Sequence, residues 1–393
     1  MNQTWNQHVV KKENKTLVLE VIKVKSPISR ADIAQVTGLN KGTVSSLVSE
    51  LIDEQLIYES GPGQSSGGRR PVMLLFNQNA GYSIGLDLGV NYLLGVLTDL
   101  NGNIIYETKV SINDFSYPSV LKQLIKSIEY LMSSTPESPY GIIGIGIGVP
   151  GIVSNEGSIL LAPNLGWENI DLKTVIEETF GLPVIIENEA NAGAYGEKMF
   201  GAGKDFSNII YISVGIGIGV GLILNDSLYK GNNGFSGELG HMTIEINGLK
   251  CRCGNRGCWE LYASEQALIK RAEELELVSS DQTISLDLLN ELAENGHMET
   301  IQLLSGIGDF LGVGINNIIN TFNPQQIIIG NRLATSEKWI KSSLDDRVNN
   351  YALRFNRDEL EIKFSELTTH STSLGVAAFI IENFFKSDLV TNP

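Results

Sequence analysis

Residues 28–52 read ISRADIAQVTGLNKGTVSSLVSELI and contain two short helical stretches separated by a turn. Ser29 is a typical helix N-cap, Asp32 follows it in the first turn, and Gly38 can leave a helix in the left-handed conformation. Asn40 can cap the second helix, in which apolar residues recur at helical spacing: Val44, Leu47, Val48, Leu51 and Ile52. A helix, a short turn containing glycine and a second helix are typical of a helix-turn-helix.

The sequence on either side of this stretch predicts the rest of a small domain. Upstream, residues 12–25 carry apolar side chains at helical spacing and end at Ser26-Pro27. Downstream, residues 56–58 and 72–76 are predicted as two short strands around a flexible loop rich in Gly, Ser and Pro. We therefore predict a winged helix-turn-helix DNA-binding domain over residues 1–77.

The second helix of this head begins with short polar and basic side chains, which suit base edges and phosphates in a major groove. Two arginines follow the glycines of the wing loop, from which they can reach phosphates or a minor groove. The predicted DNA contacts are Lys41, Thr43, Ser45, Ser46, Arg69 and Arg70. The alternative is an ordinary solvated surface, but the preceding turn and the following wing favour DNA binding.

Charge is divided unequally between the head and the rest of the chain. The 393 residues carry a net charge of −16. Residues 1–76 hold nine Lys or Arg against seven Asp or Glu, whereas the remainder holds 20 against 38. The acidic remainder would repel DNA, which leaves DNA binding to the head. Because the sequence has neither an apolar leader nor a long apolar run, we expect a cytoplasmic protein without membrane contact.

From about residue 81, strand-like stretches alternate with helical ones, which predicts an α/β body. Residues 87–107 and 215–231 are similar in pattern, because each reads as a strand, a glycine turn and a return strand. This weak internal repeat predicts a duplicated body of two lobes with a cleft between them. We place the body at residues 78–393, with one lobe at 78–190 together with the C-terminal helix and the other at 191–375.

The three cysteines lie within eight positions, at Cys251, Cys253 and Cys258, and His241 precedes them. Three thiolates and one imidazole complete the four-coordinate shell of a structural zinc ion. An odd number of cysteines in a reducing compartment argues against disulfides. Three free cysteines in a loop are the alternative, although the glycines between them offer the tight turns that a zinc knuckle needs. The pattern predicts structural zinc.

Polar residues that suit a sugar occur at three places in the body. Glu238 and Glu260 flank the cysteine loop, and Asn164 lies in a turn. Asn188, Glu189 and Asn191 stand at a strand-to-helix junction. Carboxylates and amides are needed because each sugar hydroxyl both donates and accepts hydrogen bonds. Each residue could instead cap a helix or turn, so a pocket forms only if the fold brings them together. The alternating glycines at 215–221 are a weak sign of a nucleotide.

Taken in order, these motifs resemble the ROK family, which contains bacterial sugar kinases and related repressors. The resemblance covers nearly the whole chain, and its most specific motifs are SGELGH at 236–241 and CRCGNRGCWE at 251–260. Within the family, GLNKGTVSSLVSELIDE at 38–54, SSGGRRP at 65–71 and ENEAN at 187–191 look most like xylose repressors.

The resemblance implies an actin- or hexokinase-like fold of two lobes. It implies a zinc site at His241, Cys251, Cys253 and Cys258. It also implies a sugar pocket formed by Asn164, Asn188, Glu189, Glu238, His241 and Glu260. In such proteins the zinc-bound histidine also faces the sugar.

The chain departs from the kinases of this family in its catalytic and nucleotide-binding motifs. Glu189 stands where the kinases carry an aspartate that serves as general base. Residues 87–91 read DLGVN where the kinases have a DxGGT-like phosphate loop, and Ile216 replaces a residue with a hydroxyl group. Residues 330–332, GNR, replace a glycine run near the adenosine. The resemblance therefore implies a sensor rather than an enzyme.

The resemblance implies a repressor of xylose-utilisation genes, which binds operator DNA as a homodimer and is released by D-xylose. Two alternatives remain open. One is a sugar kinase that carries a DNA-binding head. The other is a repressor that responds to glucose, N-acetylglucosamine or another hexose.

Overall fold

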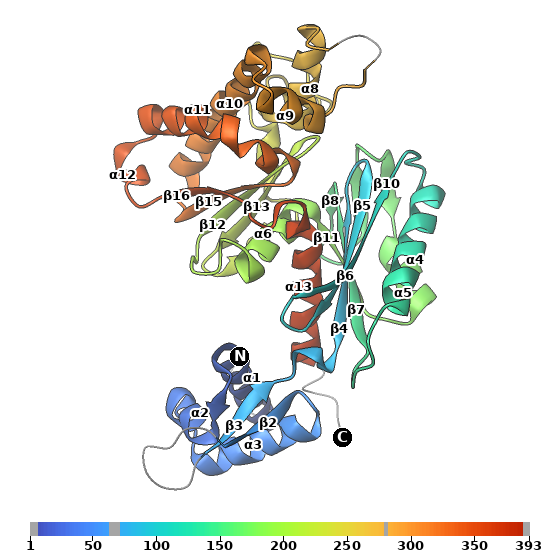
Figure 1. Cartoon of the computed structure of the whole chain (residues 1–393), viewed down its shortest axis with the longest axis vertical. Helices are drawn as coiled ribbons and strands as arrows, with labels where there is room; N and C mark the ends of the chain where they lie inside the picture. The colour runs from blue at the N-terminus through green and yellow to red at the C-terminus, as the bar shows by residue number, and fades with distance from the viewer. Residues whose placement is uncertain (1–6, 63–70, 279–281, 388–393) are drawn as a thin grey trace.

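The computed structural model describes residues 7–62, 71–278 and 282–387, and it places a small head beside a two-lobed body (Figure 1). The head contains three helices, α1 (Gln7–Lys25), α2 (Arg30–Thr37) and α3 (Lys41–Asp53). Three short strands form its sheet in the order β1-β3-β2: β1 (Ile28–Ser29), β3 (Val72–Phe76) and β2 (Ile57–Pro62). The predicted winged helix-turn-helix is confirmed.

Local hydrogen bonds explain where the two central helices begin and end. The Ser29 hydroxyl accepts the backbone N–H of Asp32 at 3.2 Å, and the Asn40 side chain accepts that of Thr43 at 2.8 Å. Between these caps, Gly38 ends α2 in the left-handed region with φ of 72°. Because each cap satisfies backbone donors at a helix start, the turn between the helices is fixed by local chemistry.

The head differs from the prediction in two details. Its first helix begins at Gln7 rather than near residue 12, and Val9 and Val10 in its first turns are exposed, so the buried stripe used for the prediction does not reach them. The sheet has a third strand, in which Ile28 pairs with Leu74 and Ser29 with Met73. A two-residue strand has no periodicity of its own, because its pairing is set by the partner strand.

The first lobe of the body is built on a five-stranded sheet in the order β11-β7-β4-β5-β6. The three strands β4, β5 and β6 pair antiparallel, whereas β7 and β11 extend the sheet in parallel. Helices α4 (Tyr117–Ser133) and α5 (Leu172–Phe180) accompany it, with a small sheet of order β10-β9-β8. The strands are β4 (Tyr82–Leu88), β5 (Tyr92–Asp99), β6 (Ile104–Ser111), β7 (Ile142–Val149), β8 (Ile152–Val153), β9 (Ile159–Ala162), β10 (Trp167–Ile170) and β11 (Val184–Asn188).

The second lobe repeats this topology with the order β14-β13-β12-β15-β16. Here β12, β13 and β14 pair antiparallel, and β15 and β16 extend the sheet in parallel. The strands are β12 (Ile209–Val214), β13 (Ile218–Leu224), β14 (Ser227–Leu228), β15 (Gln326–Gly330) and β16 (Glu361–Phe364). The accompanying helices are α7 (Glu260–Ala263), α8 (Glu265–Glu274), α9 (Leu286–Glu294), α10 (Met298–Phe322), α11 (Glu337–Tyr351) and α12 (Arg354–Arg357). The predicted internal duplication is confirmed.

Two helices, α6 (Glu189–Phe200) and α13 (Ser371–Ser387), pack against each other between the two sheets (Figure 1). A Cβ added at Gly375 would lie 1.8 Å from the Ala192 carbonyl oxygen, and one added at Gly196 would lie 2.1 Å from that of Ser371. Glycine at these positions therefore allows the two helices to approach closely. The buried carboxylate of Glu197 on α6 accepts hydrogen bonds from the hydroxyls of Ser365 and Ser371.

The other end of α13 enters the core of the head. Ile381 and Phe384 of α13 are buried in one apolar cluster with Val18, Leu51 and Leu74 of the head. The head and the body therefore share a continuous apolar core.

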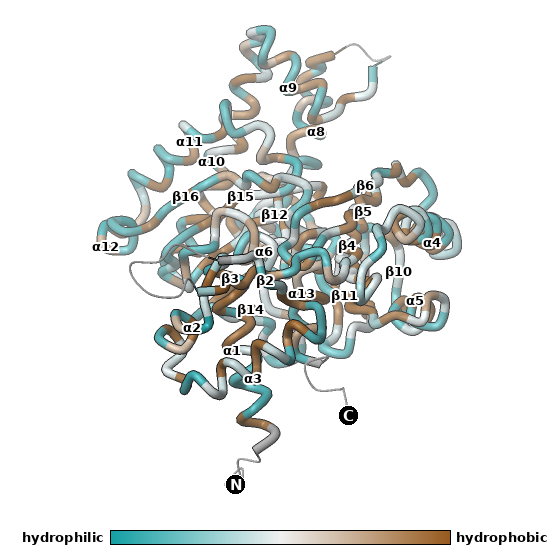
Figure 2. The backbone as a smooth tube through the Cα atoms, turned by 60° about the horizontal axis from the view of Figure 1, so that its bottom comes forward, coloured by the Kyte–Doolittle hydropathy of each residue, from teal (hydrophilic) through white to brown (hydrophobic). Residues whose placement is uncertain are grey.

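Figure 2 shows apolar segments gathered in the central strands and polar ones in outlying loops. Within the described residues, none of the helices is both long and apolar enough to cross a membrane.

Candidate functional site

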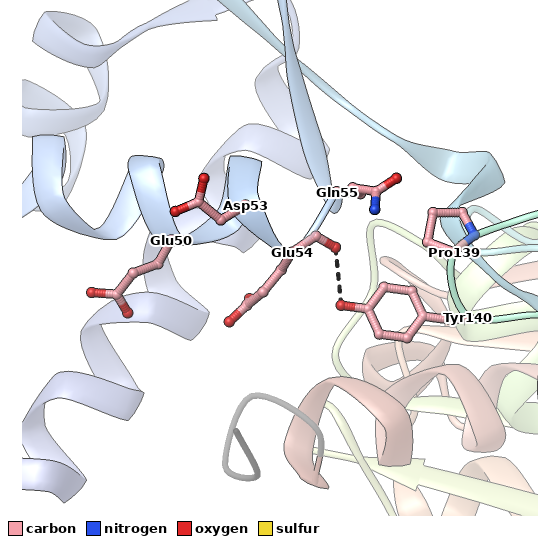
Figure 3. Close-up of a pocket in the computed structure, with 6 residues that line it drawn as sticks. All are labelled: Glu50, Asp53, Glu54, Gln55, Pro139 and Tyr140. Atoms are coloured by element: carbon pink, nitrogen blue, oxygen red, sulfur yellow. Dashed lines mark hydrogen bonds between the residues drawn. The ribbon is translucent and has the colours of Figure 1, made fainter. Parts of the chain in front are cut away.

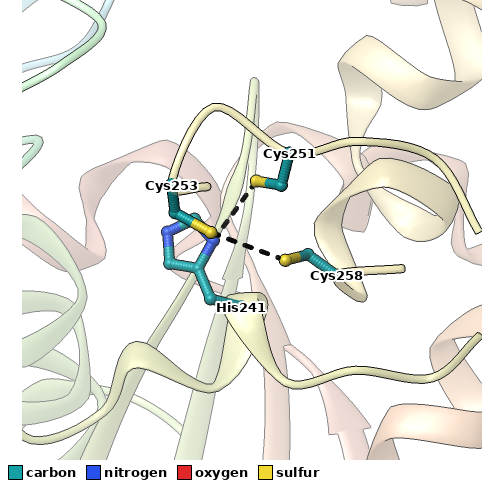
Figure 4. A group of neighbouring side chains, drawn as sticks. All are labelled: His241, Cys251, Cys253 and Cys258. Carbon is teal, nitrogen blue, oxygen red and sulfur yellow. Dashed lines mark hydrogen bonds between the residues drawn. The ribbon is translucent and has the colours of Figure 1, made fainter. Parts of the chain in front are cut away.

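The histidine and three cysteines come together at one point of the second lobe (Figure 4). His241 lies in the 3-10 turn η2 (Glu238–His241), and the cysteines lie in the loop before α7. The possible ligand atoms of His241, Cys251, Cys253 and Cys258 are all within 4.8 Å of one another.

The spacing of these atoms fits a tetrahedral metal ion. The Cys251 Sγ–His241 Nδ1 and Cys253 Sγ–Cys258 Sγ distances are both 3.7 Å. Ligand atoms around a tetrahedral zinc ion with bonds of about 2.3 Å are separated by about 3.8 Å. The loop is tight, because Gly254 and Gly257 have φ of 95° and 69°, and Cys251 N–H donates to the Asn255 carbonyl at 2.8 Å. The residues therefore fit zinc.

The three thiols have different proton affinities. Burial raises the pKa of Cys251 to about 12 and also raises that of Cys258. The backbone N–H of Asn255 lowers the pKa of Cys253. Because a metal ion binds thiolates, metal binding would release protons from the two buried cysteines in particular.

Two predicted sugar-binding carboxylates lie on either side of the His241 ring. Its Nδ1 is 3.3 Å from Glu260 Oε1, and its Nε2 is 3.9 Å from Glu238 Oε2. The Nδ1 atom also faces Cys251, so a metal ion at Nδ1 would leave Nε2 directed toward Glu238. Burial raises the pKa of Glu238. The structure therefore brings Glu238, His241 and Glu260 together.

Glycines of the second lobe set the position of this group. A Cβ added at Gly237 or Gly240 would lie 2.1 Å from a carbonyl oxygen of β13, that of Val220 or Ile218. Gly217, in the turn before β13, faces Glu260, because its added Cβ would lie 2.9 Å from Glu260 Oε2. The glycine-rich hairpin thus allows the turn that carries Glu238 and His241 to lie directly on the strand.

The second polar group, Asn188 and Glu189, lies at the start of α6. The Asn188 side chain accepts the N–H groups of Ala190 and Asn191 at 2.9 and 3.1 Å and donates to the Gly151 carbonyl at 2.9 Å. Asn188 is therefore a helix N-cap, which is the structural role that the sequence left open. Glu189 faces the second lobe, because a Cβ added at Gly219 would lie 3.9 Å from its Oε1.

Glu189, which is half-buried, also lies near the buried carboxyl group of Asp87 at the end of β4. Burial and the charge of Asp87 raise the pKa of Glu189 to about 8. Burial raises the pKa of Asp87 to about 7, although Tyr92 opposes this by donating its hydroxyl to Asp87 Oδ2 at 2.6 Å. Asn164 is exposed in the turn between β9 and β10 of the first lobe.

The predicted DNA-contacting residues lie at the start of α3. Lys41, Ser45 and Ser46 are exposed, and Thr43 is half-buried. Their helix is held by the buried side chains of Val44, Leu47 and Val48. Arg69 and Arg70 lie outside the described residues. The exposed polar face of α3 has the form that a major groove can accept.

Comparison with known proteins identifies both parts of the chain. The ROK family matches residues 83–383, and the winged helix-turn-helix DNA-binding family matches residues 12–58. The chain belongs to the ROK family. It is 49% identical over 380 residues to a protein of Bacillus spizizenii named Xylose repressor. The matched region covers 96% of this chain and 97% of that protein.

Two solved structures of ROK proteins are similar to the chain. One is a transcriptional regulator described as a homolog of the E. coli MLC protein, with a TM-score of 0.82, 29% identity and 98% coverage of both chains. The other is a glucokinase from Streptomyces griseus in complex with glucose and AMPPNP. It has a TM-score of 0.70 and 27% identity, and it covers 76% of this chain and 99% of that chain. The fold is thus a winged helix-turn-helix joined to a ROK body of the sugar-kinase type.

Side chains of this ROK protein fill positions beside both glycine hairpins. The Tyr92 ring covers Gly89, where an added Cβ would lie 2.3 Å from it. Asn331 lies beside Gly215 and donates its amide to the Ser213 hydroxyl at 3.0 Å. Arg332 forms an ion pair with buried Glu265, with a Nε–Oε2 distance of 3.1 Å.

Sequence reasoning did not select three groups that the structure places near the predicted site. Asp87 is predicted from sequence as part of a hairpin and of an altered phosphate loop but not among the sugar-side residues, although an acid near the end of a buried strand is a usable signal. Glu187, beside Asn188, forms an ion pair with Lys230 of the second lobe at 2.7 Å. Nothing in the sequence pairs residues 43 positions apart, so this contact required the fold.

Proposed function

We propose that this ROK protein is a sugar-responsive transcriptional repressor, which binds a palindromic operator as a homodimer and is released by D-xylose. Similarity over nearly the whole chain to a protein named Xylose repressor supports this proposal. The DNA-binding head would be residues 1–77, and residues 78–393 would form the sensing body. Such a repressor acts where its operator is, in the cytoplasm.

The head would read the operator through the start of α3. Lys41, Thr43, Ser45 and Ser46 would contact bases and phosphates in the major groove, and Arg69 and Arg70 would contact DNA from the wing. Two heads related by a twofold axis would match the two halves of a palindrome. The exposure of Lys41, Ser45 and Ser46 supports this assignment.

The sugar would bind between the two lobes. From the second lobe, Glu238, His241 and Glu260 would contact its hydroxyls, and Asn164 and Glu189 would do so from the first. Asn188 caps the helix, so it would contribute only the amide hydrogen that its capping bonds leave over. Zinc held by His241 and the three cysteines would be structural, since four protein ligands close its shell. Bound zinc would fix the cysteine loop and orient the His241 imidazole, whose Nε2 then remains for the sugar.

A physical connection between the sugar-side residues and the head carries this proposal. Thr372, at the start of α13, donates its hydroxyl to the Glu189 carbonyl at 3.1 Å. The same helix contributes Ile381 and Phe384 to the core of the head. A rigid helix of 17 residues therefore joins the start of α6 to the DNA-binding unit. A sugar that prefers one arrangement of the lobes would thereby bias the head.

The body would bind sugar without phosphorylating it. Glu189 has a longer side chain than the aspartate of the kinases, and displacement of a reacting group by about 1 Å can cost on the order of a hundredfold in rate. Tyr92 holds Asp87, and Asn331 fills the space beside Gly215. The kinase-type fold keeps a sugar kinase with a DNA-binding head as the second candidate.

The proposal is tested by measuring the affinity of the purified chain for a palindromic operator with and without xylose. We expect xylose to weaken operator binding, and glucose and N-acetylglucosamine to have less effect. Unchanged operator affinity in saturating xylose would contradict the proposed response, and a stronger effect of a hexose would reassign the sugar. Transfer of phosphate from ATP to either sugar would favour the kinase.

A further inference from the structure

The ion pair between Lys230 and Glu187 joins the two lobes beside the proposed sugar site. Lys230 follows β14 in the second lobe, and Glu187 is in β11 of the first. The Nζ–Oε2 distance is 2.7 Å, and the side chains are 28% and 6% exposed. A carboxylate this deeply buried depends on its partner, because an uncompensated charge in such a place is costly.

The other oxygen of Glu187 organises the start of α6. Glu187 Oε1 accepts the backbone N–H of Asn188 at 3.0 Å and the side-chain amide of Asn191 at 3.2 Å. Asn188 in turn caps the helix that begins with Glu189. One carboxylate therefore holds the sugar-side residues of the first lobe with one oxygen and the second lobe with the other.

Lys230 is the second residue of the loop 229–237, which leads directly to Glu238 and His241. The loop is closed on itself, because Ser236 N–H donates to the Lys230 carbonyl at 3.2 Å and the Ser236 hydroxyl donates to the Tyr229 carbonyl at 2.7 Å. It also touches the first lobe, since a Cβ added at Gly234 would lie 2.9 Å from the Val153 carbonyl oxygen. Anchoring Lys230 thus restrains the whole loop.

We propose that Lys230 is a positioning residue of the sugar pocket: its ion pair with Glu187 holds the Glu238–His241 turn against the Asn188–Glu189 helix start. This inference rests on the proposed function. In the arrangement of the lobes seen here, which we take as the one that binds sugar, the ion pair keeps the hydroxyl-binding groups of both lobes at a fixed separation. Binding is then tighter because less ordering remains to be done on association.

The test compares full-length K230M, K230R and E187Q with the original chain by isothermal titration calorimetry with xylose. We expect K230M to bind xylose about tenfold more weakly, in the usual range of coupling between two sites. K230R should restore most of the affinity, because arginine can also reach and pair with a carboxylate. The double variant K230M/E187Q should bind no more weakly than the weaker single variant, since both changes break one contact.

The matched control is K338M. Lys338 forms an ion pair with Glu294 at an Nζ–Oε2 distance of 2.6 Å, and the two side chains are 62% and 56% exposed. K338M should leave xylose affinity unchanged, and zinc content should be equal in all variants. Unchanged xylose binding by K230M, or additive losses in the double variant, would overturn the positioning role of Lys230 and leave the proposed function standing. Absence of xylose binding by the original chain would overturn the proposed sugar as well.

Discussion

Tyr140 offers a direct test of how the body controls the head (Figure 3). It donates its hydroxyl to the carbonyl of Glu54 at 3.0 Å, and Glu54 is the C-cap of helix α3. Its ring also packs edge-on against Phe384 of α13, with ring centroids 5.0 Å apart. Y140F keeps the ring and removes the hydroxyl, and with it this hydrogen bond between body and head.

The size of the effect follows from the surroundings of this hydrogen bond. An intramolecular hydrogen bond contributes about 0.5–1.5 kcal/mol net. An open pocket lined by Glu50, Asp53 and Gln55 lies beside it, so water can reach the Glu54 carbonyl in the variant. We therefore expect the lower part of that range, about 0.5–1 kcal/mol, which corresponds to about a two- to fivefold change in an equilibrium constant.

Fluorescence anisotropy with a labelled operator measures the result. The quantity to compare is the ratio of operator dissociation constants with and without saturating xylose, which should fall about two- to fivefold in Y140F. Y130F is the matched control, because Tyr130 is 50% exposed on α4 of the body. If Y140F and Y130F give the same ratio as the original chain, the Tyr140 contact does not transmit the sugar signal.

Three further predictions concern the metal, the DNA and Glu189. Elemental analysis should find one zinc ion per chain in the original protein and none in C253S. The melting temperature of C253S should be lower, because a bound metal stabilises the folded state. Equal zinc content in C253S would contradict the site. K41M should weaken operator binding about tenfold. If Lys41 contacts a phosphate, the slope of log affinity against log salt concentration should also become shallower by about 1. An unchanged slope would show that Lys41 does not contact a phosphate in the interface. The folded-state pKa of Glu189 is raised to about 8, so its stabilising contribution is complete below the ordinary value near 4.5 and is lost as pH rises through about 8. Urea unfolding from pH 5 to 8.5 should therefore show falling stability, with a flatter profile for E189Q; parallel profiles would refute the assignment.

The head could be predicted almost completely from sequence, because its helix ends are encoded locally. Ser29, Gly38 and Asn40 each act within three or four residues of their own position. The cysteine cluster could also be predicted, since chemically rare residues at short spacing leave few arrangements. Asn188 shows the limit of this reasoning, because an asparagine before a helix is equally suited to a cap and to a ligand.

The rest depended on contacts between distant segments. No local pattern pairs Lys230 with Glu187, or indicates that Tyr92 covers Gly89 rather than pointing to solvent. The third strand of the head could not be predicted for the same reason, because Ile28 and Ser29 become a strand only by pairing with Leu74 and Met73. These features follow from the tertiary arrangement and were open to prediction only once the fold was known.

The contribution of α13 to the core of the head has a consequence for how the protein is made. Val18, Leu51 and Leu74 are translated more than 300 residues before Ile381 and Phe384, which complete their cluster. The apolar core of the head is therefore complete only after α13 has been made. A chain cut short before α13 would lack these two core side chains, so we expect it to hold the operator less firmly than the full-length protein, which would limit its action as a repressor that no sugar can remove.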